Sequence, residues 1–139
     1  MLADYWFEYP VRVHPHQTDY AGVIWHGSYV VWLEEARVEY LRALGIEYAD
    51  LIAAGCELPV VDLSIRYHRA IKMGTAGVVV KTCLCELKGV RINWDYRIES
   101  LEGLHVTARV TIVAIDWHKA KIMRQLPPII QEALTRIPG

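Results

Sequence analysis

A short stretch near the N-terminus holds residues whose types and order could do chemistry. It runs from Gln17 to Tyr29 and contains one carboxylate, Asp19, in a turn-rich loop. An aspartate can attack an acyl carbon or take a proton from water. His26 and Gly27 come just before a predicted helix, where the first backbone N–H groups lack intrahelical acceptors and the helix dipole is positive. Such groups stabilise a carbonyl oxygen that gains negative charge, so the stretch predicts an acyl-transfer site.

The same residues also have structural interpretations, and these stay open here. Asp19 could hold the loop as an Asx turn or a capping residue. The His26 side chain could orient the loop, and its backbone N–H is the stronger candidate for a chemical role. Aromatic residues such as Trp25 and Tyr29 more often belong to a core or a subunit interface than to the lining of an acyl pocket. Three histidines in and near the loop lack the spacing of a metal motif, so no metal site is predicted: His14, His16 and His26.

A helix is predicted directly after this loop, from Ser28 to Leu44. Ser28 or Gly27 can cap its start, and Gly45 can adopt the left-handed conformation that ends it. Its first turn is apolar on every side, which predicts deep burial. One apolar stripe runs along the helix: Tyr29, Leu33, Ala36, Tyr40 and Leu44. Such a helix needs another element wrapped around it.

The rest of the chain is dominated by alternating apolar and polar residues, which predict β-strands. Five strands are expected: residues 5–14, 61–68, 77–87, 91–99 and 104–115. Turns at 72–74, 88–89 and 103 predict that the last four strands form an antiparallel meander. Short helices are expected at residues 48–54 and 129–136.

The fold class is therefore α+β, with the long helix packed on the concave face of a five-stranded antiparallel sheet. We expect a single domain over residues 1–139, because the chain contains no linker or repeat. The other face of the sheet carries polar residues that meet solvent or a second copy: Arg66, His68, Arg91, Arg97 and Glu99.

The composition excludes several classes of protein. With 53% hydrophobic residues, some apolar surface is expected to be covered by a partner subunit. The net charge is -1, and Lys and Arg are scattered, so nothing indicates a nucleic-acid partner. No apolar run approaches the ~20 residues of a membrane span, and the N-terminus lacks the regions of a signal peptide. Three cysteines, two of them the strand neighbours Cys83 and Cys85, predict buried thiols in a reducing cytoplasm rather than disulfides or metal ligands.

The loop and the helix after it resemble the hotdog-fold thioesterases of the 4-hydroxybenzoyl-CoA thioesterase type. The likeness is strongest to the Tol-Pal-associated branch of small acyl-CoA thioesterases, which shows a T-D-x-x-G-V-V-Y-H-x-x-Y pattern and then an E-x-A-R segment. Here these are residues 18–29 and Glu34 to Arg37, and residues 58–70 look like the second strand of the family. The likeness covers roughly residues 7–120. Two departures are Gln17, where an acidic residue or glycine is common, and Tyr20, where a small residue is usual and a tyrosine is expected to reshape the pocket.

The resemblance implies a hotdog fold, in which the sheet wraps around one long central helix, and an acyl-CoA thioesterase. It implies a homodimer, often paired into a homotetramer, with active sites at the subunit interface. Asp19 matches the catalytic carboxylate, as nucleophile or general base. The backbone N–H of His26, with that of Gly27 beside it, matches the oxyanion donor. No cofactor is implied, since coenzyme A is part of the substrate.

Further residues are candidates for binding the substrate. Gly22, Trp25 and Tyr29 are expected to contact the acyl group or its thioester. Four basic residues could meet the CoA phosphates, although each is also an ordinary surface charge: Arg66, Arg69, Lys88 and Arg91.

Two other functions remain open beside hydrolysis. The hotdog fold also hosts enoyl-thioester hydratases and dehydratases, in which a carboxylate and a histidine such as Asp19 and His26 share acid–base work. The second of these alternatives is a non-catalytic module that binds acyl-CoA. The acyl group is expected to be small or medium and could be aromatic, as Tyr20 and Trp25 hint, and acyl carrier protein could replace CoA.

Overall fold

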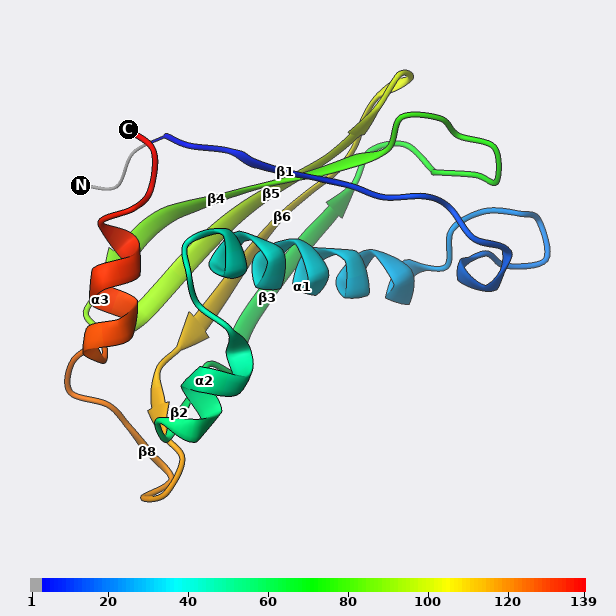
Figure 1. Ribbon diagram of the computed structural model, residues 1–139. Coiled ribbons are helices and arrows are strands. Elements are labelled where there is room, and N and C mark those ends of the chain that lie inside the picture. The colour runs from blue at the N-terminus through cyan, green and yellow to red at the C-terminus, as the bar shows by residue number, and fades with distance from the viewer. Residues whose placement is uncertain (1–3) are drawn as a thin grey trace.

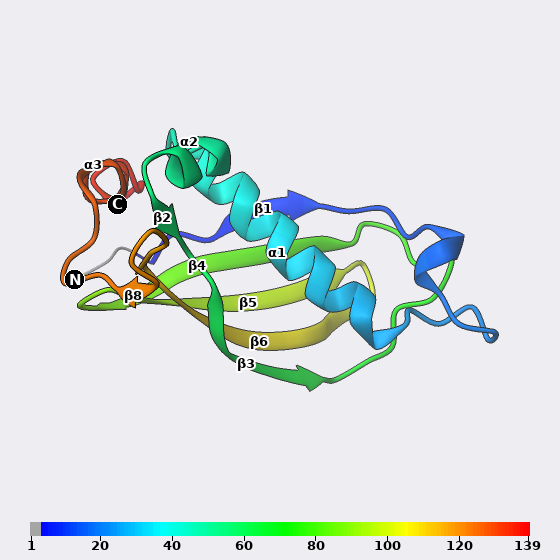
Figure 2. The ribbon, with the colours of Figure 1, turned by 90° about the horizontal axis from the view of Figure 1, so that it is seen from below.

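The structure is a computed structural model that describes residues 4–139. Five strands form one antiparallel sheet: β1 (Phe7–Pro10), β3 (Val60–Tyr67), β4 (Val79–Lys88), β5 (Arg91–Ser100) and β6 (Gly103–Val113). The long helix α1 (His26–Ala43) lies along one face of this sheet, as Figures 1 and 2 show from two sides. The predicted α+β architecture is confirmed.

The position of β3 differs from the prediction. The sheet order is β1-β4-β5-β6-β3, so β3 pairs with β6 at one edge of the sheet and does not pair with β4. The predicted four-strand meander was therefore wrong, and only β4, β5 and β6 follow one another as hairpins. The physical reason is the connection over residues 68–78, which is too long for a tight hairpin and carries the chain across the sheet.

Helix α1 buries the predicted stripe, because all five of its residues lie against the sheet. Its first turn departs from the prediction of deep burial, since Val30 and Val31 are 40% and 50% exposed. The described residues of the chain cover only the side of the helix that faces the sheet, so apolar residues on its other sides are exposed to solvent. The start also differs, because Trp25 is the N-cap and Ser28 lies within the first turn. Gly45 has a φ of +91°, as its predicted role requires.

Shorter elements complete the fold. Strand β1 is shorter than predicted and is followed by the 3-10 turn η1 (Pro15–Gln17), while α2 (Tyr48–Ala53) and α3 (Pro128–Leu134) lie near the predicted places. A small second sheet was not predicted: β2 (Cys56–Glu57), β7 (Ile115–Asp116) and β8 (Lys121–Ile122). Strands of two residues show no periodicity that a sequence could reveal.

The face of the large sheet away from α1 is polar, as predicted. Lys81 and Arg97 lie 3.0 and 2.8 Å from the carboxylate of Glu99, and Arg109 lies 2.9 Å from that of Asp95. Hydrogen bonds from Arg97 and Lys81 lower the pKa of Glu99. Within residues 4–139, no helix is both long and apolar enough to cross a membrane.

Candidate active site

The loop between η1 and α1 closes on itself through backbone hydrogen bonds. The Asp19 N–H donates to the Val23 carbonyl at 2.8 Å, and the Gly22 N–H donates to the Asp19 carbonyl at 3.0 Å. Gly22 has a φ of +72°, a conformation that a side chain at this position would strain. Thr18 and Ile24 form a bridge that closes the loop at its base. The predicted turn-rich loop is therefore a compact and ordered one.

The Asp19 carboxylate is part of this loop. Its Oδ1 accepts hydrogen bonds from the backbone N–H groups of Ala21 at 2.9 Å and Val23 at 3.1 Å. This is an Asx turn, so the structural interpretation of Asp19 is confirmed. The side chain is exposed, and its Oδ2 has no hydrogen-bond partner among residues 4–139. Oδ1 thus stabilises the loop, and Oδ2 is free to accept a hydrogen bond from another molecule. The catalytic role of Asp19 stays a prediction.

Helix α1 starts where the oxyanion donors were predicted. His26 and Gly27 are its first two residues, so their N–H groups have no acceptor within the helix. The Gln17 carbonyl fixes this start, because it accepts the Trp25 N–H at 2.8 Å and the Ser28 hydroxyl at 3.1 Å. Two adjacent donors therefore lie at the positive end of an 18-residue helix.

Gly27 and Trp25 are in close contact at this helix start. A Cβ atom on Gly27 would lie 2.7 Å from Cε3 of the Trp25 indole and closer still to Cζ3 and Cη2. Only glycine leaves room for the ring in this position. The indole, which is 55% exposed, therefore lies over the first turn of α1.

The connection between β3 and β4 packs against the loop and extends the site. The Ile24 N–H donates to the Ile71 carbonyl, and the Met73 N–H donates to the Gly22 carbonyl, both at 2.8 Å. The buried Tyr29 hydroxyl accepts the Ile71 N–H at 3.3 Å. Two segments far apart in sequence are thus joined beside the start of α1.

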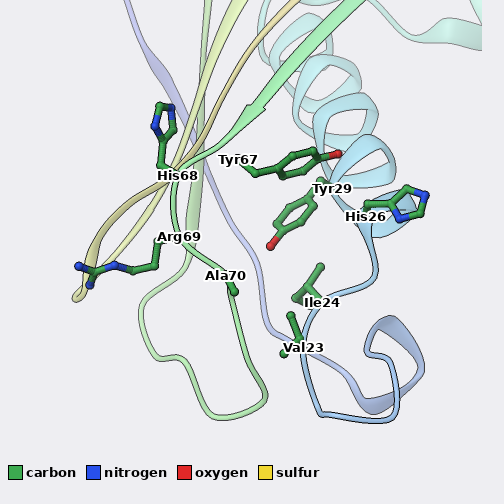
Figure 3. Close-up of a pocket in the computed structure, with 8 residues that line it drawn as sticks. All are labelled: Val23, Ile24, His26, Tyr29, Tyr67, His68, Arg69 and Ala70. Atoms are coloured by element: carbon green, nitrogen blue, oxygen red, sulfur yellow. The ribbon is translucent and has the colours of Figure 1, made fainter.

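A pocket of about 320 Å³ lies between these segments (Figure 3). Its lining is mostly apolar, and the Tyr29 and Tyr67 rings meet there with centroids 5.4 Å apart. The lining residues are Val23, Ile24, His26, Tyr29, Tyr67, His68, Arg69 and Ala70. The side chains of His68 and Arg69 point away from the other labelled side chains in Figure 3, so the pocket is mostly apolar although both residues are polar.

The pocket gathers only part of the predicted set. His26 and Tyr29 line it, whereas Asp19 and Gly22 lie in the adjoining loop and Trp25 lies over the helix start. Tyr20 is fully exposed and is not among the lining residues of this pocket, so its effect on the pocket stays a prediction. His14 and His16 stack with ring centroids 5.6 Å apart, and no group of three or more potential metal ligands occurs within residues 4–139.

The four basic candidates for CoA phosphates are not brought together. Arg66 is exposed opposite Thr107, and Arg69 donates to the Glu102 carbonyl at 2.6 Å, both near the pocket end of the sheet. Lys88 and Arg91 pair at the β4–β5 turn, which lies at the far end of the same strands. Within one copy of the chain the four residues therefore do not form a single phosphate site, and their role in binding CoA stays a prediction.

His105 is a residue of the site region that the sequence did not reveal. It is fully buried, its carbonyl accepts the His68 N–H at 2.8 Å, and its Nδ1 lies 3.1 Å from the Arg69 carbonyl. Nδ1 faces a carbonyl, so it carries a proton, and Nε2 forms a hydrogen bond with the Ser100 hydroxyl at 2.6 Å. The ring thereby fixes the pocket wall formed by residues 68 and 69. A lone histidine in a strand carries no signal of this role.

Comparison with known proteins gives the family. Residues 13–136 match the model of the thioesterase-like superfamily, and the chain belongs to that superfamily. Its sheet and central helix form the hotdog fold, as the resemblance implied.

Individual relatives point the same way. The Synechocystis protein named "Putative esterase sll0410" is 51% identical over 138 residues, covering 98% of this chain and 82% of that one. The acyl-CoA thioesterase YbgC of Haemophilus influenzae is 32% identical over 121 residues, covering 86% and 88%. Among solved structures, a DHNA-CoA thioesterase from Staphylococcus aureus superimposes with a TM-score of 0.85 at 30% identity, covering 95% of this chain and 90% of that one.

Proposed function

We propose that this protein hydrolyses the thioester of a small or medium acyl-CoA, aromatic acyl groups included, to the free acid and CoA. The observation that carries the proposal is the start of α1. There the free N–H groups of His26 and Gly27 adjoin an apolar pocket of about 320 Å³ and a loop that presents the open oxygen of Asp19. Relatives named acyl-CoA thioesterases support the same reaction.

In the proposed reaction the thioester carbonyl oxygen lies against the N–H groups of His26 and Gly27. Asp19, acting as general base, takes a proton from water, and the resulting hydroxide adds to the carbonyl carbon. The N–H groups stabilise the oxyanion that forms. When the C–S bond breaks, CoA leaves as the thiolate and takes up the proton. With Asp19 as nucleophile instead, an acyl–aspartate anhydride forms first and water then cleaves it. Neither route needs a cofactor beyond the coenzyme A of the substrate.

The experiment that tests the reaction is thiol release from a panel of acyl-CoA thioesters, with the acid product identified by mass spectrometry. Short aliphatic, longer aliphatic and aromatic acyl groups belong in the panel, and each is offered again on acyl carrier protein. Release of free thiol together with free acid from one acyl class supports the proposal and identifies the carrier. Absence of release from every thioester contradicts it.

One observation favours a second candidate reaction. His26 and His68 are among the residues that line the pocket, whereas Asp19 is not, so the lining offers imidazoles but no carboxylate. Hydration of an enoyl thioester would use such a group as acid–base catalyst. The product separates the two reactions, because hydration leaves the thioester intact and adds water to the double bond. Binding without either product would indicate a non-catalytic acyl-CoA module.

The proposal includes a cytoplasmic homodimer, with a homotetramer as its paired form. Strand β3 supports the dimer, because it lies at a sheet edge and exposes the apolar side chains of Val61 and Leu63. Val30 and Val31 on α1 are exposed as well. We expect Leu63→Lys to shift the protein to monomers in light scattering, with Lys88→Glu, on the far hairpin, as a control that leaves the mass unchanged. A dimer that survives Leu63→Lys contradicts this interface.

A further inference from the structure

A second cavity continues along α1 from the pocket at its start. The helix residues His26, Val30, Leu33 and Arg37 are spaced four, three and four apart, so they share one face of the helix. His26 lines the first pocket, and the other three line the second cavity, of about 150 Å³. Strand β3 forms the opposite wall of both, with Tyr67 in the first and Leu63 in the second. The second cavity therefore lies farther along α1, between the same helix and the same strand.

Arg37 in this cavity is a buried charge without a buried counter-charge. It is only 3% exposed, its Nη1 donates to the Tyr96 hydroxyl at 3.0 Å, and its Nε is buried without a hydrogen-bond partner among residues 4–139. Its Nη2 lies 4.0 Å from a carboxylate oxygen of Glu34, but that side chain is 70% exposed to water. A guanidinium is always charged, and burying it unpaired is costly.

The neighbouring phenols do not supply the missing charge. Burial raises the pKa of Tyr96 and of Tyr48, in each case against the opposing effect of the Arg37 guanidinium. Both side chains are therefore neutral phenols at ordinary pH. Arg37 is also one of the residues that line the cavity, so its positive charge lies at the wall that a group entering from outside would meet.

The size and place of the cavity indicate what that group is. Apart from Arg37 and Glu34, the lining is aliphatic: Val30, Leu33, Val60, Leu63 and Val110. A cavity of about 150 Å³ is large enough to hold benzene. Arg37 follows His26 by eleven residues, which is about 16 Å along the helix axis, and its side chain leans back toward the helix start. An acyl group whose thioester lies at His26 thus reaches Arg37 with its far end.

We propose that the second cavity receives the far end of the acyl group and that Arg37 selects acyl groups ending in a carboxylate. This inference rests on the proposed thioesterase function and names its substrate class. The hydrocarbon part of the acyl group packs between Val30, Leu33 and Leu63, and the terminal carboxylate accepts hydrogen bonds from the guanidinium. Arg37 would then be a specificity-determining residue, since it lies far from the bond that breaks.

The test compares two substrates that differ only at the far end, octanoyl-CoA and the mono-CoA thioester of octanedioic acid. Shorter and longer dicarboxylic thioesters locate the best length. The wild type is expected to prefer the dicarboxylic thioester. Arg37→Met should lower kcat/KM for the dicarboxylic thioester on the order of 10- to 100-fold, because one charged hydrogen-bonding group is removed. The same substitution should leave kcat/KM for octanoyl-CoA within about threefold of the wild-type value. Arg42→Gln, an exposed arginine on the same helix, is the control that should change neither value.

A second readout does not depend on turnover. Octanedioate should raise the melting temperature of the wild type more than octanoate does, and the difference should vanish in Arg37→Met and Arg37→Gln. If the wild type hydrolyses both thioesters equally well, or if both variants lose both activities in parallel, the inference is overturned. Dissociation of the oligomer in both variants also overturns it, because a carboxylate of a second copy would then be the counter-charge. Absence of all thioester hydrolysis contradicts the proposed function instead, and the melting experiment still decides the role of Arg37.

Discussion

Gly27→Ala tests the geometry of the helix start most finely. The added Cβ would lie 2.7 Å from Cε3 of the Trp25 indole and nearer to two other ring atoms, so the ring has to leave its position. Forcing such a displacement costs about 1–3 kcal/mol. Alanine in place of glycine inside a helix contributes about 0.8–1.0 kcal/mol of the opposite sign. We therefore expect a net loss of unfolding free energy of about 0–2 kcal/mol.

A double-mutant cycle with Trp25→Ala separates the two terms. In the Trp25→Ala background nothing opposes the new methyl group, and Gly27→Ala should stabilise the protein by up to about 1 kcal/mol. The coupling energy between the two positions should then be about 1–3 kcal/mol. Urea unfolding of the four proteins, followed by circular dichroism, measures it. Equal effects of Gly27→Ala in both backgrounds would refute the placement of the indole over the first turn.

Two further predictions concern buried polar groups. His105→Phe replaces the imidazole with an apolar ring and leaves the Arg69 carbonyl and the Ser100 hydroxyl without this partner, so we expect a loss of about 1–3 kcal/mol in the free energy of unfolding, and an unchanged urea midpoint would contradict the role of His105. Burial, together with Asp95, raises the pKa of the Cys85 thiol to about 11, so the reactive thiolate is scarce at pH 8 and increases until pH reaches about 11. The rate of iodoacetamide labelling at Cys85 in the folded protein, followed by mass spectrometry, should therefore rise with a midpoint near pH 11, whereas a midpoint near pH 8.5 would show an ordinary thiol.

The sequence was sufficient to predict the elements whose signal is periodic. The stripe from Tyr29 to Leu44 predicted α1 and its buried face, and strict alternation predicted the strands of the large sheet. Alternation shows which residues share a face, but it does not show which strand is the neighbour. The edge position of β3 depends on the path of residues 68–78 across the sheet, which no local pattern encodes.

The sequence predicted the loop of the candidate site but not the buried arginine or the second cavity along α1. The order Asp19, His26, Gly27 marked the helix start, and the structure adds that the Asp19 carboxylate also holds the loop. Arg37 belonged to a recognisable segment, but nothing in its position indicated a buried guanidinium facing a cavity. Burial of a charge depends on what packs around it from other elements, here Tyr96 of β5 and Leu63 of β3.

The most direct test of the proposed chemistry is the rate of thiol release by Asp19→Asn, measured beside Asp19→Ala and the wild type. Asparagine keeps the side-chain oxygen that accepts the Ala21 and Val23 N–H groups, so the loop should persist, whereas alanine removes it. If Asp19 is the general base or nucleophile, Asp19→Asn should unfold like the wild type and lose on the order of 10²–10⁴ in kcat. A wild-type rate in Asp19→Asn, with stability lost only in Asp19→Ala, would show that Asp19 does no more than hold the loop.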